Sequence, residues 1–222
     1  MDPEAQLQRV PNFRDVGKTV NQFLEKRTIR EGLFFRSGRL KDEKIPGIKY
    51  HGIKINGKAF EWHLLSLLSW WDFLKFIFLF VFQYRIEAIR VLSRRVMVPR
   101  GLVRIALDTI DHCGPELREA LSFYTSPQTL PCVIHCTQGK DRTAAIEHDY
   151  FLTDGALMPT RPQMLKEIRE VGLTDEWAST ARDMISAIER HIRDNHGGLD
   201  RYLDSIGFDQ HQRDRVRETL LY

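Results

Sequence analysis

Three stretches of the chain have the hydrophobic patterns of short strands. Residues 32–37 read Gly-Leu-Phe-Phe-Arg-Ser, and residues 48–56 alternate apolar and polar side chains before a turn at Asn56-Gly57. Residues 130–135 form a brief apolar run of the kind found in a strand that is buried on both faces. We therefore expect strands early and in the middle of the chain.

The C-terminal third has the periodicity of helices. Apolar side chains recur three and four positions apart along one face, at Trp177, Ala181, Met184, Ile188 and Ile192. Gly197-Gly198 is expected to end this helix, and a second helix is predicted from Asp209 onward. Strands followed by helices predict an α/β fold.

Residues 64–82 are the most apolar part of the chain, with 15 apolar positions in 19. Asp72 and Lys75 lie near the centre, and each costs about 2.5–3.5 kcal/mol in the middle of a bilayer. This cost cancels the gain from the apolar side chains, about 0.3–0.6 kcal/mol each, so a membrane span is not predicted. Two interpretations stay open: a buried core helix, or a lid or interfacial helix.

The charge of the chain is concentrated directly after this apolar segment. Six arginines and one glutamate give residues 85–104 a net charge of +5, whereas the whole chain carries only +3. The small total predicts no nucleic-acid partner. The basic stretch is by default a solvated helix face, and the alternative is contact with anionic lipid headgroups.

The composition limits the class of protein. With 222 residues, 42% of them hydrophobic and 28% charged, the chain can bury a core, which excludes wholesale disorder. Three cysteines argue against a disulfide scaffold, and no apolar run follows Met1 as in a signal peptide. We therefore expect one cytoplasmic domain, residues 1–222, with an apolar and basic helical insertion at about 60–104 and peripheral membrane contact as an option.

One run of nine residues carries recognisable chemistry. It reads His135, Cys136, Thr137, Gln138, Gly139, Lys140, Asp141, Arg142 and Thr143. Because a buried strand is predicted directly before it and a helix is expected to start at Thr143, its backbone N–H groups can turn inward and cradle a phosphate.

The residue types in this run suit phosphoryl transfer. Gly139 allows a sharp bend, and the amides of Thr137 and Gln138 contribute to the cradle. The same field of N–H groups stabilises a thiolate at Cys136 and makes it a nucleophile at neutral pH. Arg142 offers a planar fork that can hold two phosphoryl oxygens.

The leaving oxygen needs a proton, which Asp141 is expected to supply as a general acid. Lys140 adds a second cation over the substrate. The hydroxyl of Thr143 can donate to the cysteine sulfur, and His135 is expected to hold the loop in shape. Two acids upstream of the predicted strand are weaker candidates for the acid: Asp108 and Asp111.

This loop resembles the signature of the cysteine-dependent tyrosine phosphatases, in the His-Cys-x-x-Gly-Lys-Asp-Arg-Thr branch typified by mycobacterial protein tyrosine phosphatase B and its fungal relatives. Three other segments are similar to that branch: Asn-Phe-Arg-Asp-Val-Gly at 12–17, Phe-Arg-Ser-Gly at 35–38, and Tyr-Leu-x-x-Ile-Gly at 202–207. Within the first segment, Arg14 and Asp15 are expected to form a structural ion pair near the site.

The resemblance implies a central, mostly parallel sheet flanked by helices, with an apolar lid at residues 64–93. It also implies a phosphocysteine mechanism without a metal or other cofactor. The implied substrates are phosphotyrosine, phosphoserine or phosphothreonine in proteins, and phosphoinositides.

Two departures from the branch leave an alternative open. The usual Asp-Leu-Arg strand after the Arg-Ser motif is missing, and Thr143 is followed by a short Ala-Ala-Ile and then the polar residues from Glu147. Both departures remove core, so the alternative is a catalytically impaired module that binds phosphate or phosphoinositide on a truncated scaffold.

The other cysteines and the histidines beside them have a structural interpretation. Cys113 and Cys132 are expected to be buried apolar fillers. The pairs His112-Cys113 and His135-Cys136 raise the question of a zinc site, but their separation fits no common close-spaced ligand pattern, so no metal is predicted.

Overall fold

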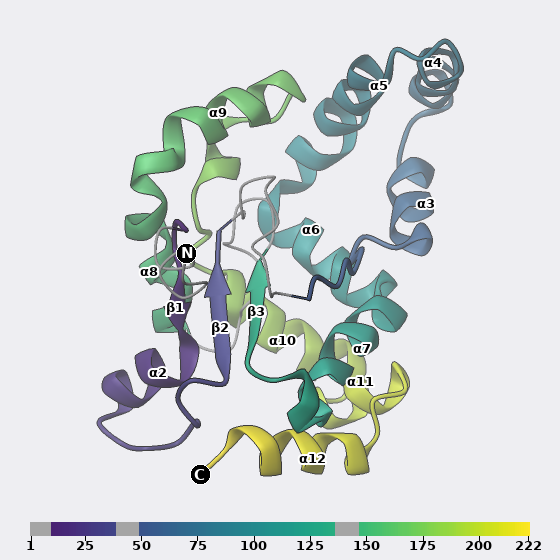
Figure 1. The fold of residues 1–222 in the computed structure, drawn as a ribbon. Helices are drawn as coiled ribbons and strands as arrows, with labels where there is room; N and C mark the ends of the chain where they lie inside the picture. The colour runs from purple at the N-terminus through teal and green to yellow at the C-terminus, as the bar shows by residue number, and fades with distance from the viewer. Residues whose placement is uncertain (1–9, 39–48, 136–146) are drawn as a thin grey trace. The chain divides into compact units, whose positions relative to one another are not determined.

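The computed structural model describes residues 10–38, 49–135 and 147–222 (Figure 1). They belong to two compact units. Unit 1 comprises the described residues within 1–53, 118–160 and 200–222, and unit 2 comprises residues 54–117 and 161–199.

Unit 1 contains a sheet of three strands, β1 (Arg14–Asp15), β2 (Phe34–Ser37) and β3 (Cys132–His135), in the order β1-β2-β3. The strands predicted within 32–37 and 130–135 are confirmed as β2 and β3. β2 is parallel to β3 but antiparallel to β1. In the described part of the chain the sheet is thus small and mixed, and the expected mostly parallel sheet is not found.

The prediction of a strand over 48–56 is wrong for residues 49–56, the part of this segment that the structure describes. Residues 49–56 form neither helix nor strand. Alternation of apolar and polar side chains makes a strand only where a neighbouring strand accepts its backbone hydrogen bonds, and these residues pair with none of the three strands. Instead, the ring of His51 lies edge-on to Phe123 at 4.7 Å, and Gly57 begins the next helix as its N-cap.

The helices of unit 1 are α2 (Val16–Leu24), α8 (Glu147–Leu157), α11 (Leu199–Ser205, whose first residue belongs to unit 2), α12 (Gln210–Leu220), and the 3₁₀ turns η2 (Phe123–Thr125), η3 (Pro127–Thr129) and η4 (Met158–Thr160). α2 packs on β2 and α8. The predicted last helix is confirmed as α12, which begins with a capping box between Asp209 and Gln212.

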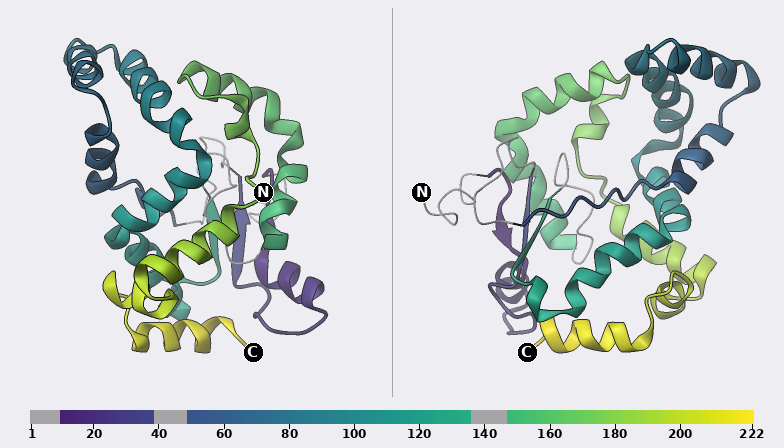
Figure 2. Two further views of the ribbon diagram at one scale, coloured as in Figure 1. Left: turned by 180° about the vertical axis from the view of Figure 1, so that it is seen from behind. Right: turned by 45° about the vertical axis from the view of Figure 1, so that its right-hand side comes forward.

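The helices of unit 2 are α3 (Lys58–Ser66), α4 (Trp70–Val81), α5 (Arg85–Leu92), the π-helical turn η1 (Ser93–Met97), α6 (Val98–His112), α9 (Arg161–Glu170), the 3₁₀ turn η5 (Asp175–Ala178) and α10 (Met184–His196). Figure 2 shows them in two further views. α7 (Gly114–Ser122) leads from unit 2 into unit 1.

The helix predicted around Trp177–Ile192 is confirmed in its C-terminal part. α10 runs to His196 and ends at Gly197, whose φ of 73° is the left-handed conformation that glycine adopts easily. Trp177 lies in η5 instead, and a turn separates it from α10. The apolar pattern continues on both sides of this turn because Trp177 and Met184 are both buried in unit 2.

The apolar segment 64–82 forms two helices instead of one. Ser69 caps α4, with its hydroxyl accepting a hydrogen bond from the backbone N–H of Asp72, and so separates α4 from α3. No residue of α4 is buried, so the interpretation as a core helix is wrong for this part of the segment. Among the described residues, no helix has both the length and the hydropathy needed to cross a bilayer.

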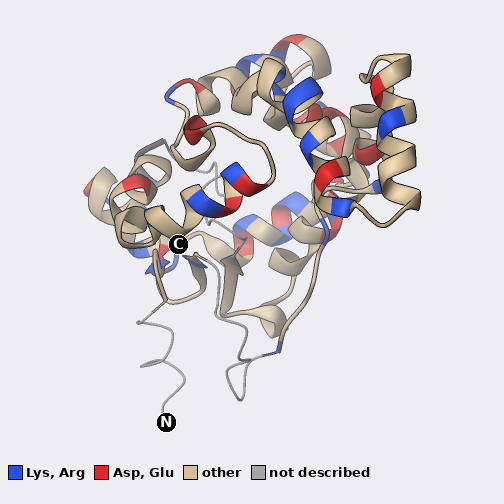
Figure 3. Ribbon diagram, turned by 90° about the horizontal axis from the view of Figure 1, so that it is seen from above, with Lys and Arg blue, Asp and Glu red and all other residues tan. Residues whose placement is uncertain are grey.

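The basic stretch 85–104 is helical, as expected, and spans α5, η1 and the first turns of α6. A bend occurs in α6 at Gly101, where φ is 74°. Figure 3 shows the charged residues along the ribbon; those of α4 are Asp72 and Lys75.

Candidate active site

The strand that leads to the predicted phosphate loop is present. β3 ends at His135, which is in register with Ser37 of β2, and α8 begins at Glu147. The chain therefore passes from a strand of the sheet to a helix between these two residues, as the predicted loop requires. The loop residues themselves lie outside the described residues, and their roles stay predictions: Cys136, Thr137, Gln138, Gly139, Lys140, Asp141, Arg142 and Thr143.

The Phe-Arg-Ser-Gly segment forms the central strand beside β3. Arg36 and Ser37 are each only 1% exposed. The Ser37 hydroxyl donates to the carbonyl of Gly38 at 3.0 Å, and the Gly38 N–H donates to the carbonyl of Pro11 at 2.7 Å. The second bond holds the chain after β2 to the chain before β1, and the pairing of β1 with β2 joins the segments 12–17 and 35–38.

A second arginine lies opposite the first. Arg14 of β1 is the register partner of Arg36, and its Nη2 donates to Oγ1 of Thr153 on α8 at 3.2 Å. Next to it, the rings of Phe13 and Phe35 stack with 5.4 Å between their centroids. Sequence reasoning gave Arg36 no role, although an arginine in an otherwise apolar strand was the signal that could have identified it as a buried cation.

The carboxylate of Asp15 accepts hydrogen bonds from two backbone N–H groups. Its Oδ1 caps α2 by accepting from the N–H of Lys18 at 3.2 Å, and its Oδ2 accepts from the N–H of Gly32 at 2.6 Å. Adjacent residues of a strand point to opposite faces, so Arg14 and Asp15 make separate contacts. The described contacts thus support a structural role for both residues but not the ion pair predicted between them.

At two further positions of this segment, the backbone conformation or the space around the backbone restricts the residue type. Asn12 adopts φ 61°, in the left-handed region that asparagine tolerates better than most residues, and its side chain accepts from Arg14. A Cβ on Gly17 would lie 2.6 Å from the carbonyl oxygen of Arg30, closer than a side chain can approach. The segment 12–17 therefore anchors the chain beside the sheet.

Two of the three cysteines are unsuited to nucleophilic attack. Cys113 is fully buried, and burial raises the pKa of the Cys132 thiol to about 11. A thiol with such a pKa is protonated at neutral pH, and the protonated form is not the nucleophile. The prediction of a buried filler is confirmed for Cys113, whereas Cys132 is only partly buried, and Cys136 is the remaining candidate.

The alternative acids Asp108 and Asp111 are held within unit 2. Asp108 is 1% exposed, and its two oxygens each accept from the guanidinium of Arg100 at 2.7 Å. Nε of Arg104 lies 3.3 Å from the same carboxylate. A carboxylate so enclosed cannot reach the leaving oxygen of a substrate, so Asp108 is excluded as the general acid.

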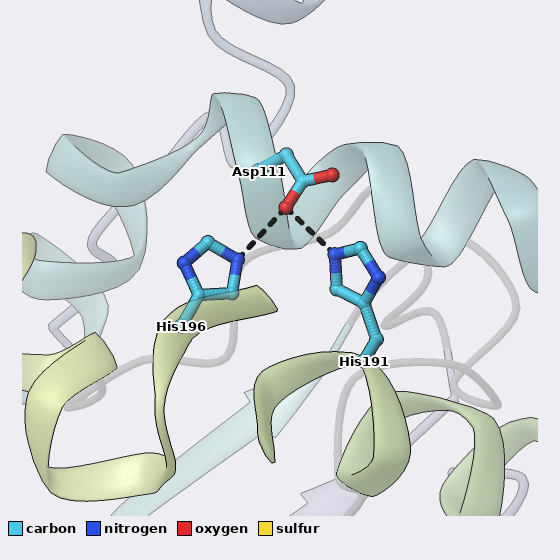
Figure 4. A group of neighbouring side chains, drawn as sticks. All are labelled: Asp111, His191 and His196. Carbon is cyan, nitrogen blue, oxygen red and sulfur yellow. Dashed lines mark hydrogen bonds and ion pairs between the residues drawn. The ribbon is translucent and has the colours of Figure 1, made fainter. Parts of the chain in front are cut away.

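Asp111 belongs to a cluster with two histidines of α10 (Figure 4). Its Oδ1 lies 2.7 Å from Nε2 of His191 and 2.9 Å from Nε2 of His196. Among the described residues these three are the group that could hold a metal ion, and two imidazoles with one carboxylate are ligands of zinc.

The side chains of this cluster are joined by hydrogen bonds. Nδ2 of Asn195 lies 2.8 Å from Nδ1 of His191. When this amide donates to Nδ1, the hydrogen of the neutral ring is on Nε2 and is donated to Asp111. We therefore interpret the cluster as a link between α6 and α10, which sequence reasoning could not find because its members lie 80 positions apart.

Replacing Asp111 by asparagine is expected to lower the free energy of unfolding by about 1–2 kcal/mol near neutral pH, since hydrogen bonds to a charged acceptor are lost. Burial acts to raise the pKa of Asp111, but the bonds from His191 and His196 outweigh it, and the pKa lies below its usual value. A lowered carboxyl pKa stabilises the fold above the unfolded pKa of about 3.9, and this contribution is lost as the pH falls through the folded value.

Urea unfolding of both proteins between pH 7 and pH 3 measures this difference. It should be present near neutral pH and shrink below about pH 4. Asp194→Asn, an exposed carboxylate on the same helix α10, is the matched control and should change stability little. A difference for Asp111→Asn that is equal at every pH would contradict the account of this cluster.

In unit 1, a strand of a small sheet ends directly before a cysteine-containing run whose residue types suit phosphate esters. Residues 87–222, well over half of the chain, match the model of the tyrosine phosphatase family. The chain therefore belongs to the tyrosine phosphatase family, and phosphatase activity is the general function that this indicates. No curated protein matches the sequence.

Proposed function

We propose that this protein hydrolyses phosphate monoesters through a phosphocysteine intermediate formed on Cys136. The observation that carries the proposal is the course of the chain: β3 ends at His135, directly before the cysteine, and α8 follows the loop. Membership of the tyrosine phosphatase family supports the proposal, as do the burial of Cys113 and the raised pKa of the partly buried Cys132.

In the first step the Cys136 thiolate attacks phosphorus while Arg142 and the loop amides hold the non-bridging oxygens. The bond from phosphorus to the leaving oxygen breaks, and Asp141 gives this oxygen its proton. In the second step water attacks the phosphocysteine and gives a proton to Asp141. The sulfur leaves as a thiolate, stabilised by the Thr143 hydroxyl, and inorganic phosphate is released.

The proposed substrates are phosphotyrosine and, in addition, phosphoserine, phosphothreonine or phosphoinositides. Lys140 supports the more highly charged members of this set, because it adds a cation beside Arg142. No step needs a metal or another cofactor. The thiolate also needs a reducing environment, which is consistent with a cytoplasmic location.

The packing of the helix after the loop bears on the alternative of an impaired binding module. α8 has only 11 residues, yet three of its side chains, one or two turns apart, are buried: Tyr150, Thr153 and Leu157. This helix therefore keeps a packed face, which supports the enzyme over the impaired module.

The experiment that tests the proposal is phosphate release by the purified full chain from phosphotyrosine, phosphoserine and phosphoinositide substrates, measured side by side in the presence of a metal chelator. We expect turnover on at least one of them. Binding of phosphate analogues without release of phosphate from any substrate would favour the impaired module and contradict the proposal.

A further inference from the structure

The apolar helix α4 leaves its side chains outside the core of unit 2. None of its 12 residues is buried, and its principal neighbour is α5 (Figures 1 and 2). Its large apolar side chains are between 39% and 78% exposed at Trp70, Trp71, Leu74, Ile77, Phe78, Phe80 and Val81. Contiguous apolar surface of this kind marks an interaction site in a protein that is otherwise soluble.

The spacing of these residues places most of them on one side of the helix. Trp70, Leu74, Ile77 and Val81 are separated by four, three and four positions, and so share a face. Trp71 and the residue seven positions later, Phe78, extend this face on its flank. We call the six residues the α4 apolar face.

The next side of α4 lines an open groove with a volume of 420 Å³. Asp72, Lys75 and Leu79, at spacings of three and four, are its α4 residues. α5 and η1 supply the rest of the lining: Glu87, Arg90, Val91, Arg94 and Arg95. We call this the basic groove, because four cations face two carboxylates.

Two cations of the basic groove have no carboxylate partner in the described chain. Arg95 pairs with Asp72, with 3.3 Å from Nε to Oδ1, and Arg90 pairs with Glu87. Lys75 and Arg94 are the two that remain without an ion pair among the described residues. The groove can therefore accept an anion from outside the protein, directly beside the α4 apolar face.

We propose that the α4 apolar face and the basic groove dock this protein on an anionic membrane surface. The helix would lie in the plane of the interface, with its apolar face in the boundary of the acyl chains and the groove cations on headgroup phosphates. Tryptophan prefers this depth, which suits Trp70 and Trp71. Twelve residues are about 18 Å of helix, too short to span the bilayer core.

Charge complementarity favours lipid over a protein occupant. A second copy of this chain or another protein would cover the apolar face but would need its own acidic groups for Lys75 and Arg94. An anionic bilayer supplies apolar and acidic surface together. This inference goes beyond the proposed phosphatase activity and does not rest on it.

Vesicle co-sedimentation of the full chain tests the proposal, with phosphatidylcholine vesicles that contain increasing fractions of phosphatidylserine. Binding should rise with the phosphatidylserine fraction and fall with salt. The variant Trp71→Ser/Phe78→Ser should lose most of the binding. Lys75→Gln/Arg94→Gln should weaken it about 5-fold for each charge removed.

The matched control is Arg190→Gln/Arg193→Gln, which removes the same charge from exposed positions of α10 in the same unit and should change binding little. A variant with Trp62→Phe and Trp177→Phe leaves Trp70 and Trp71 as reporters. Their fluorescence should shift to shorter wavelength when anionic vesicles are added.

Three results would overturn the proposal: sedimentation that ignores the phosphatidylserine fraction, equal weakening by the α10 control, or burial of Trp70 and Trp71 by self-association without lipid. Failure of the phosphatase proposal gives a different pattern. Cys136→Ser protein, which should not turn over substrate, is expected to bind vesicles as the wild type does.

Discussion

Cys136→Ser is expected to abolish turnover, with a loss of about four to six orders of magnitude in kcat. A serine hydroxyl is protonated at neutral pH and is not activated by the field of a phosphate cradle as a thiol is. Binding of a phosphate mimic such as vanadate or tungstate should survive, because the backbone amides and Arg142 stay in place. Phosphate release and equilibrium binding, measured on one preparation, check both parts of the expectation.

The matched control for this substitution is Cys132→Ser. Cys132 precedes the loop by four positions, but its thiol is partly buried in β3 and its pKa is raised. We expect this variant to keep turnover within a few-fold of the wild type. Wild-type rates in Cys136→Ser, or their loss only in Cys132→Ser, would remove Cys136 from the mechanism.

Asp141→Asn is expected to slow hydrolysis by about 10²–10⁴-fold for substrates with poor leaving groups. An alkyl or tyrosyl oxygen needs its proton as the bond to phosphorus breaks, whereas a nitrophenolate leaves without one. The loss should therefore be small for p-nitrophenyl phosphate and large for phosphotyrosine peptides. A series of aryl phosphates with leaving groups of different pKa measures this dependence directly.

The slope of log kcat/KM against the leaving-group pKa should become steeper in Asp141→Asn than in the wild type. Glu147→Gln, which removes an acidic residue six positions later in the sequence, is a comparison variant for a general effect of charge. An equal loss for all leaving groups would mean that Asp141 positions the loop without giving a proton, and the acid would have to be sought elsewhere.

The local pattern of apolar residues predicted several elements correctly. β2 and β3 were predicted from apolar runs at 32–37 and 130–135, and α12 from its start at Asp209. The strand expected at 48–56 had an equally good alternation but has no partner strand among the described residues. Alternation shows that a segment can be a strand, and pairing decides whether it is one.

The apolar segment shows a second limit of sequence reasoning. Composition made a core helix and an interfacial helix equally good interpretations of 64–82. The choice depends on what lies next to the helix, and the structure leaves α4 exposed while it buries Phe60 and Leu64 of α3. Hydrophobicity alone does not show whether a helix is buried in the core or exposed as a binding surface.

The side-chain contacts of the two acids before β3 could not be predicted from the sequence. Asp108 and Asp111 were weak candidates for the acid because they come shortly before the strand of the loop. The structure instead places Asp108 against Arg100 and Asp111 against two histidines of α10. The loop motif itself could be found because its chemistry is confined to nine consecutive residues.

The central claim is that the sulfur of Cys136 is a thiolate at neutral pH. Site-resolved alkylation with iodoacetamide between pH 4 and pH 10, read by mass spectrometry, tests it with the other cysteines as internal controls. We predict that Cys136 reacts with an apparent pKa well below 7, while buried Cys113 and Cys132, whose pKa is about 11, stay unmodified at pH 7. A Cys136 that titrates near the free value of about 8.5 would contradict the account.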